Sequence, residues 1–259
     1  MTDTTERRMG GNATMHTRGT GRVRTAVVWD ALRRTVDELA GPEGRALDVI
    51  DAGGGTGGFA VPLAGLGHRV TVVDASPDAL AALERRAAEA GVAVESVQGD
   101  AGELLDLIGP ARADLVLCHS VLEYVDDPAA AMAAVAGAVR PGGAVSVLVA
   151  GRVAAALHRA VGGHFDDARR ALDDPAGRWG DRDPVPLRFT RQALSELAVA
   201  AGLRVTELHG VRIFADLVPG GVLDGDPEAV ESLIALESAA AVHPVLRDLA
   251  TQLHLLARG

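Results

Sequence analysis

The sequence predicts an α/β fold built on one mostly parallel sheet. Strand-like apolar runs alternate with helical patterns between residues 46 and 149, which is typical of repeated βαβ units. The first predicted strand ends in an acid and a cluster of glycines, residues 51–58, and the next one, residues 69–74, also ends in an acid. These observations indicate a ligand site at the carboxyl ends of the strands.

The elements follow in regular order. Residues 22–39 have the apolar spacing of a helix that ends at Gly41-Pro42. Ser76-Pro77 and Asp127-Pro128 have the side-chain cap and first-turn proline of helix starts. The predicted strands of the alternating part are residues 46–50, 69–73, 92–97, 113–118 and 144–149, and the predicted helices between them include residues 77–90, 103–108 and 128–140.

The alternation stops after residue 150. Residues 151–189 contain two helical patterns and a stretch rich in Asp, Gly and Pro. Because loops at this edge of an open α/β sheet border the ligand crevice, we expect a lid, with a plain surface loop as the alternative. Residues 190–259 contain a helix capped by Thr190, a strand or bulged strand pair over 204–214, a helix over 227–240 and a last strand over 252–256.

Composition limits the class of protein. The chain has 259 residues, a net charge of −10, one cysteine, and no polar-flanked apolar leader or run of membrane-spanning length. We therefore expect a cytoplasmic protein without a disulfide or a membrane partner. Residues 1–34 carry seven arginines against three acidic residues, so the predicted flexible arm over 1–21 can either touch phosphate or remain solvated.

The glycine cluster fits two nucleoside-binding patterns. Asp74 lies 21 positions after Gly53, where an acid accepts from ribose hydroxyls. Gly53, Gly55 and Gly58 match the dinucleotide pattern G-x-G-x-x-G, whereas Asp51 before the glycines matches D-x-G-x-G-x-G. The second pattern resembles the class I S-adenosylmethionine-dependent methyltransferases, and we favour it because of that acid. A nicotinamide or flavin enzyme, and a glycine turn that binds nothing, remain the alternatives.

Further segments resemble one particular group of these methyltransferases. Residues 118–128, 163–166 and 210–214 resemble the bacterial tRNA 5-carboxymethoxyuridine methyltransferases along most of the chain. The resemblance implies a Rossmann-like core over 22–150, a helical lid insertion over 151–189, and C-terminal helices and strands over 190–259. It also implies a seven-stranded, mostly parallel sheet with one antiparallel strand, and S-adenosylmethionine as the cofactor.

The resemblance also implies roles for individual residues. Arg24 would pair with the cofactor carboxylate, Asp74 would hold the ribose hydroxyls, and His119 would touch the cofactor or the methyl acceptor. Solvation is the alternative for Arg24, and a strand-end histidine without function is the alternative for His119. The remaining cofactor-binding candidates lie in the glycine loop and beside the adenine: Asp51, Gly53, Gly54, Gly55, Asp100 and Ala101.

The methyl acceptor stays open at this stage. A carboxylate acceptor is already anionic and would need a cationic donor, for which Arg212 is the candidate. A salt bridge within the final strands is the alternative for Arg212. A hydroxyl acceptor would need a base, for which His119 is the candidate. The acceptor is tRNA or a small metabolite, and a catalytically silent cofactor-binding protein is a third reading. Residues 173–183 are rich in aspartate, and this negative charge does not favour RNA binding. The sequence shows no metal-ligand pattern, so we expect no metal. The oligomeric state stays open.

Overall fold

The computed structural model describes residues 6–223 and 225–259, with side chains from residue 21 on, and it contains a seven-stranded sheet in the order β3-β2-β1-β4-β5-β7-β6. Strands β1 to β5 pair in parallel, and β7 is antiparallel to both of its neighbours. The predicted mostly parallel sheet with one antiparallel strand is confirmed. The strands are β1 Asp48–Ala52, β2 Arg69–Asp74, β3 Glu95–Gln98, β4 Ala113–His119, β5 Val139–Ala150, β6 Arg204–Val211 and β7 Gln252–Arg258.

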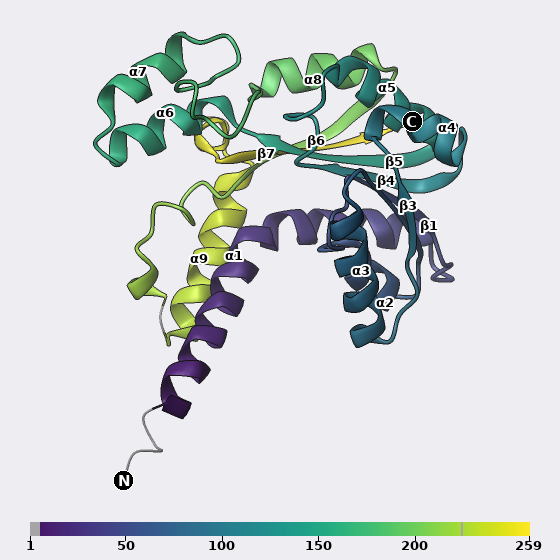
Figure 1. The fold of residues 1–259 in the computed structure, drawn as a ribbon, viewed down its shortest axis with the longest axis horizontal. Helices are drawn as coiled ribbons and strands as arrows, with labels where there is room; N and C mark the ends of the chain where they lie inside the picture. The colour runs from purple at the N-terminus through teal and green to yellow at the C-terminus, as the bar shows by residue number, and fades with distance from the viewer. Residues whose placement is uncertain (1–5, 224) are drawn as a thin grey trace.

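Helices cover both faces of this sheet (Figure 1). One face carries α4 Leu104–Ile108, α5 Pro128–Ala138 and α8 Arg191–Ala200, and the other carries α1 Glu6–Ala40, α2 Ala60–Gly65 and α3 Pro77–Ala90. Each face buries its own aliphatic cluster. The pair α6 Arg152–Val161 and α7 Phe165–Asp173 follows the carboxyl end of β5, and α9 Pro227–Ala241 packs along α1.

The helix starts expected from the sequence are present. Ser76 Oγ accepts from the backbone N–H of Ala79, and Asp127 Oδ1 accepts from Ala129 and Ala130. Thr190 caps α8 in the same way. These side chains satisfy backbone donors that a helix leaves unpaired in its first turn, so each helix begins where its cap lies.

Two expectations differ from the structure. Helix α1 begins at Glu6, so residues 6–21 belong to it where we expected a flexible arm, and residues 1–5 lie outside the described residues. Residues 211–214 also do not form the second strand of a bulged pair, because this region contains the single strand β6, which ends at Val211. The backbone N–H groups of Ile213, Phe214 and Ala215 instead donate to the buried carboxylate of Glu237 on α9.

An ion-pair network closes the amino ends of the central strands. Asp114 accepts from Arg45 at 3.0 and 3.1 Å, and Asp48 accepts from Arg69 and Arg140. Although burial opposes it, the paired guanidinium groups and the N–H of Asp48 lower the pKa of Asp114 to about 2. This edge is therefore stabilised by charge, and the opposite edge is left for ligands.

Candidate active site

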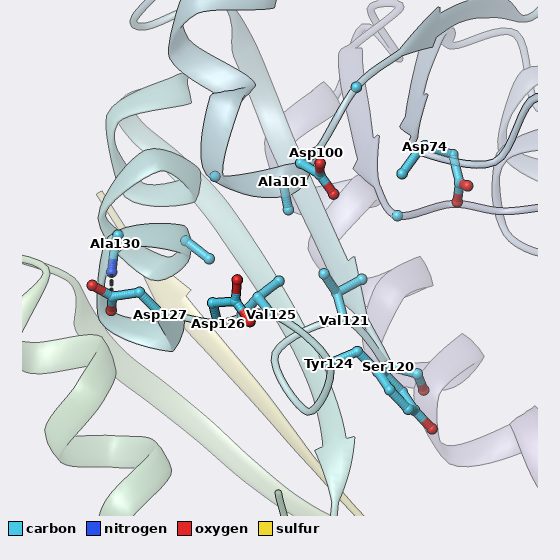
Figure 2. A pocket seen from close by; sticks show the side chains of 15 residues that line it. Asp74, Asp100, Ala101, Ser120, Val121, Tyr124, Val125, Asp126, Asp127 and Ala130 are labelled. Atoms are coloured by element: carbon cyan, nitrogen blue, oxygen red, sulfur yellow. Dashed lines mark hydrogen bonds between the residues drawn. The ribbon is translucent and has the colours of Figure 1, made fainter. Parts of the chain in front are cut away.

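A cavity of about 500 Å³ lies at the carboxyl ends of the parallel strands. Because β1, β2, β3 and β4 run in the same direction, the segments that follow them meet at one edge. Figure 2 shows Asp74, the pair Asp100 and Ala101, and the segment from Ser120 to Ala130 around this cavity. Its size is that of a typical small-molecule or cofactor site.

The glycine loop forms one wall by close backbone packing. Gly53 has φ +73°, and a Cβ placed on it would lie 2.2 Å from Val121 Cγ2. A Cβ on Gly54 would lie 2.6 Å from the carboxylate of Asp51, which is buried beneath the loop. Burial, together with the nearby charge of Asp74, raises the pKa of Asp51 to about 7. Asp51 thus supports the loop from below, while Gly53 itself lines the cavity.

Asp74 lies at the tip of β2 and organises the loop around it. Its Oδ2 accepts from the backbone N–H of Gly55 at 2.8 Å, and its Oδ1 accepts from Ser76 at 2.9 Å. Both oxygens keep further lone pairs, and the side chain lines the cavity (Figure 2). It is therefore positioned to accept from paired hydroxyl groups.

Acidic residues dominate the polar lining. Asp100 begins a short helical turn over Ala101–Glu103 as its N-cap, and Ala101 is buried against the cavity. The carboxylates that line the cavity are Asp74, Asp100, Asp126 and Asp127. Such a lining attracts a cationic ligand and repels a pyrophosphate. The backbone cradle and the charge fit S-adenosylmethionine, which is a sulfonium, better than a dinucleotide.

His119 is the last residue of β4, and its side chain lies against the neighbouring strand β5. Its Nε2 is 2.8 Å from Ser146 Oγ, its ring packs edge-on against Phe59, and its Nδ1 is buried without a partner among the described residues. Burial lowers its pKa to about 3, so the ring is neutral at neutral pH. His119 is not among the residues that line the cavity, although its neighbour Ser120 is.

Arg212 is held in a left-handed backbone conformation, with φ +62°. Glu237 holds the turn that follows Arg212, because this carboxylate accepts from three consecutive backbone N–H groups at 2.7 to 2.9 Å. The guanidinium forms an ion pair with Asp216 at 2.7 Å and donates to Gln252 Oε1 at 3.4 Å. Gln252 Nε2 in turn donates to Ser120 Oγ at 3.2 Å, so Arg212 is linked to the cavity wall.

Arg24, which lies on α1, also pairs with the carboxylate of Asp216. Its guanidinium is 3.2 Å from Asp216 Oδ1 and about half exposed. Thr251 also donates to Asp216. Arg24, Asp216 and Arg212 therefore form a cluster in which two cations share one anion, which leaves one positive charge beside the carboxyl edge of the sheet.

Several residues of this site carry no signal in the sequence. Gln252 and Asp216 occupy ordinary strand and loop positions, and only the pairing of β7 with β5 brings Gln252 to Ser120. Glu237 lies within an amphipathic helix, where a charge is expected to be exposed. The φ of +57° at Ser120, a non-glycine residue after a strand, is likewise visible only in the structure.

The comparisons with known proteins agree with this geometry. A family model described as a methyltransferase domain matches residues 50–147. A ubiquinone biosynthesis O-methyltransferase of Cupriavidus pinatubonensis (strain JMP 134 / LMG 1197) is 38% identical over 176 residues, which are 68% of this chain and 67% of that protein. The chain belongs to the class I S-adenosylmethionine-dependent methyltransferases, and S-adenosylmethionine is the methyl donor of this family. This assignment decides between the two glycine patterns.

Two further proteins resemble most of the chain. The tRNA 5-carboxymethoxyuridine methyltransferase of Escherichia coli (strain K12) is 28% identical over 247 residues, which are 92% of this chain and 88% of that protein. A crystal structure of an S-adenosylmethionine-dependent methyltransferase from Mesorhizobium loti matches with a TM-score of 0.57 at 21% identity, over 89% of this chain and 97% of that one. The latter likeness concerns the fold.

Across residues 6–223 and 225–259, no helix is long and apolar enough to cross a membrane. Among the side chains that the structure describes, from residue 21 on, no group of three or more His, Cys, Asp and Glu is arranged to hold a metal ion.

Proposed function

We propose that this methyltransferase esterifies the carboxylate of 5-carboxymethoxyuridine in tRNA, in the cytoplasm. The observation that carries the proposal is the Arg24–Asp216–Arg212 cluster, which is linked through Gln252 to Ser120 in the cavity wall. A carboxylate needs no general base, because it is anionic at neutral pH. The enzyme then has to align this anion with the methyl group, and alignment supplies much of the rate. The resemblance to the tRNA enzyme over 92% of the chain supports this acceptor.

The cofactor-binding roles complete the proposal. Asp74 accepts from the ribose hydroxyls, Asp100 and Ala101 flank the adenine, and Gly53 and Gly54 allow close approach of the methionine portion. Asp51 and Gly55 shape the loop from within. Bound S-adenosylmethionine supplies a methyl group activated on a sulfonium. Arg24, which is about half exposed, pairs with the cofactor carboxylate, and Arg212 donates hydrogen bonds to the acceptor carboxylate. The cluster and the cofactor carboxylate then balance in charge, and the sulfonium supplies the positive charge that faces the acceptor.

We also propose that residues 151–189 act as a lid over the acceptor. This insertion is internally braced, since Arg188 forms a nearly buried ion pair with Asp183 at 2.7 Å and Arg159 lies 3.5 Å from the Trp179 ring centroid. Its helices nevertheless expose Val161, Phe165 and Leu172. Exposed apolar side chains beside a ligand edge support contact with a nucleobase or another flat substrate.

A small-molecule acceptor is the second candidate. The four aspartates of the cavity and the net charge of −10 oppose a phosphate-rich partner. The similarity to a ubiquinone biosynthesis O-methyltransferase at 38% identity also favours a hydroxyl on a small molecule.

Transfer of a tritiated methyl group separates the two candidates. The enzyme is incubated with labelled cofactor and either tRNA that carries 5-carboxymethoxyuridine, the same tRNA as an unmodified transcript, or a small-molecule extract. We expect label only in the modified tRNA, released by mild alkali because a methyl ester hydrolyses and an ether does not. Alkali-stable label, or label confined to the small-molecule extract, would overturn the tRNA proposal. Asp74→Ala serves as the cofactor-site control.

A further inference from the structure

Four polar side chains form a continuous row of hydrogen bonds across the sheet. His119 Nε2 lies 2.8 Å from Ser146 Oγ, and the same oxygen lies 2.8 Å from His254 Nε2. His254 Nδ1 lies 3.2 Å from His209 Nδ1. The row follows the spatial order of strands β4, β5, β7 and β6, and Ser146 and His254 are fully buried.

The two ends of the row differ. At the outer end, His209 Nε2 lies 3.1 Å from Glu207 Oε2, and this carboxylate pairs with Arg34 of α1 at 2.9 Å. At the inner end, His119 Nδ1 is buried and lacks a partner among the described residues. The inner end lies at the ligand edge, since the His119 ring contacts Phe59 after the glycine loop and Ser120 lines the cavity.

The carboxylate of Glu207 determines which group donates in each hydrogen bond of the row. Glu207 can only accept, so His209 Nε2 carries the hydrogen and His209 Nδ1 is bare. His254 must then donate from Nδ1 and accept at Nε2, and the Ser146 hydroxyl donates to it. Ser146 Oγ accepts in turn from His119 Nε2, which leaves His119 Nδ1 without a hydrogen.

Burial supports neutral rings throughout the row. It lowers the pKa of His119 to about 3, and it holds the pKa of His254 well below its usual value, an effect to which the neighbouring His119, His209 and Arg34 add. It also lowers the pKa of His209, although Glu207 opposes this effect. A neutral ring has one donor and one acceptor nitrogen. The tautomer of His209, which Glu207 sets, therefore determines the tautomers of His254 and His119.

We propose that Glu207, acting through His209, His254 and Ser146, fixes His119 in the tautomer whose bare Nδ1 accepts from an N–H or O–H group of a bound ligand. The four residues are positioning residues, and only His119 meets the ligand. This arrangement involves only side chains of this chain, and it does not depend on which methyl acceptor the enzyme uses.

Histidine tautomers are measured directly by long-range ¹H–¹⁵N correlation on protein labelled at its histidine rings. The sequence contains eight histidines, and variants that each replace one of them assign the signals. We expect the hydrogen on Nε2 in His119 and His209 and on Nδ1 in His254. A hydrogen on Nε2 of His254, or a cationic ring at any of the three, would contradict the proposed direction.

Variants test whether the surface carboxylate sets the tautomers. Glu207→Gln offers either an oxygen or an NH₂ to His209, so we expect mixed tautomers in all three rings. Ser146→Ala interrupts the row, so we expect mixed tautomers in His119 alone while His209 stays as in the wild type. Glu38→Gln is the matched control, because it removes a carboxylate paired with Arg258 that touches no histidine. Unchanged tautomers in both test variants would refute the proposal.

Ligand probes locate the donor group. S-adenosylhomocysteine has an amine that 5′-methylthioadenosine lacks, and the 5-carboxymethoxyuridine nucleoside represents the acceptor. A hydrogen-bond shift of the His119 Nδ1 signal with S-adenosylhomocysteine alone assigns the donor to the cofactor amine, and a shift with the nucleoside assigns it to the acceptor. Affinity for the active probe should fall about twofold in Ser146→Ala for an even mixture of His119 tautomers, because only rings with a bare Nδ1 can accept from the probe. Absence of a shift with every probe would show that Nδ1 serves no ligand.

Discussion

The backbone N–H of Gly55 donates to Asp74 Oδ2 at 2.8 Å, so the acid at the tip of β2 and the glycine loop after β1 form one unit. Because the two strands are adjacent and parallel, this bond holds the loop open at the edge where the cavity lies. Substitutions in either element therefore affect both the shape of the loop and the ligand.

Asp74→Ala should lower the affinity for S-adenosylhomocysteine at least tenfold. The change removes the acceptor proposed for the ribose hydroxyls, and hydrogen bonds to a charged group contribute about 1.5–3 kcal/mol each. Some stability will be lost as well, because Gly55 and Ser76 also donate to Asp74. Titration calorimetry measures the affinity. Asp78→Ala, an exposed acid in the first turn of α3, is the control, and equal affinity in the two variants would mean that Asp74 lies outside the ligand site.

Gly53→Ala should abolish cofactor binding and destabilise the protein, whereas Gly58→Ala should do neither. The new methyl group at Gly53 would lie 2.2 Å from Val121 Cγ2, at a φ of +73° that disfavours a side chain. At Gly58 a Cβ meets nothing within 4 Å and φ is not positive. Thermal unfolding with and without S-adenosylhomocysteine compares them. Wild-type behaviour of Gly53→Ala would show that the loop and the segment at Val121 readily separate.

The ligand-free protein should lose stability as the pH rises from about 4 to 7. The pKa of Asp51 is raised to about 7 by burial, so the folded state holds a proton that the unfolded state releases near pH 4. At 1.36 kcal/mol per pKa unit, this costs at most about 4 kcal/mol above pH 7. Asp51→Asn should flatten the decline. Melting temperatures across this range measure it, and an equally steep decline in Asp51→Asn would place its cause elsewhere, with Glu123, whose pKa burial also raises to about 7, the next carboxyl to test.

Arg212→Ala should lower the methyl-transfer rate more than His119→Ala, and the wild-type rate should be flat from pH 6 to 8. A carboxylate acceptor needs a cation and no base. His119, whose pKa is lowered to about 3, does not titrate in this range, contrary to the ordinary value of about 6.5 that a free histidine would show. Single-turnover rates check both statements. Arg204→Ala, at an exposed arginine of β6, the strand that Arg212 follows, is the control. A larger effect of His119→Ala would favour a hydroxyl acceptor.

Glu237→Gln should destabilise the protein by about 2–4 kcal/mol, because an amide cannot accept from all three N–H groups that the buried carboxylate now satisfies. The turn after Arg212 should loosen, so activity should fall beyond the loss of folded protein. Denaturant unfolding gives the stability, and Glu228→Gln, exposed in the first turn of the same helix, should have no effect. A stability equal to that of Glu228→Gln would show that the turn does not depend on Glu237.

The sequence alone determined the alternating strands and helices, the helix caps and the glycine loop, because each of these has its signal within a short stretch of the chain. Alternating apolar runs, Ser76 and Asp127 as caps, and an acid at the end of each of two strands are local signals. The tertiary structure alone decided which distant groups meet. The pairing of β7 between β5 and β6 brings His254 to Ser146 and His209, and α9 brings Glu237 to the turn after Arg212. A buried polar group must find its partner across the sheet, and no pattern within one strand encodes that partner.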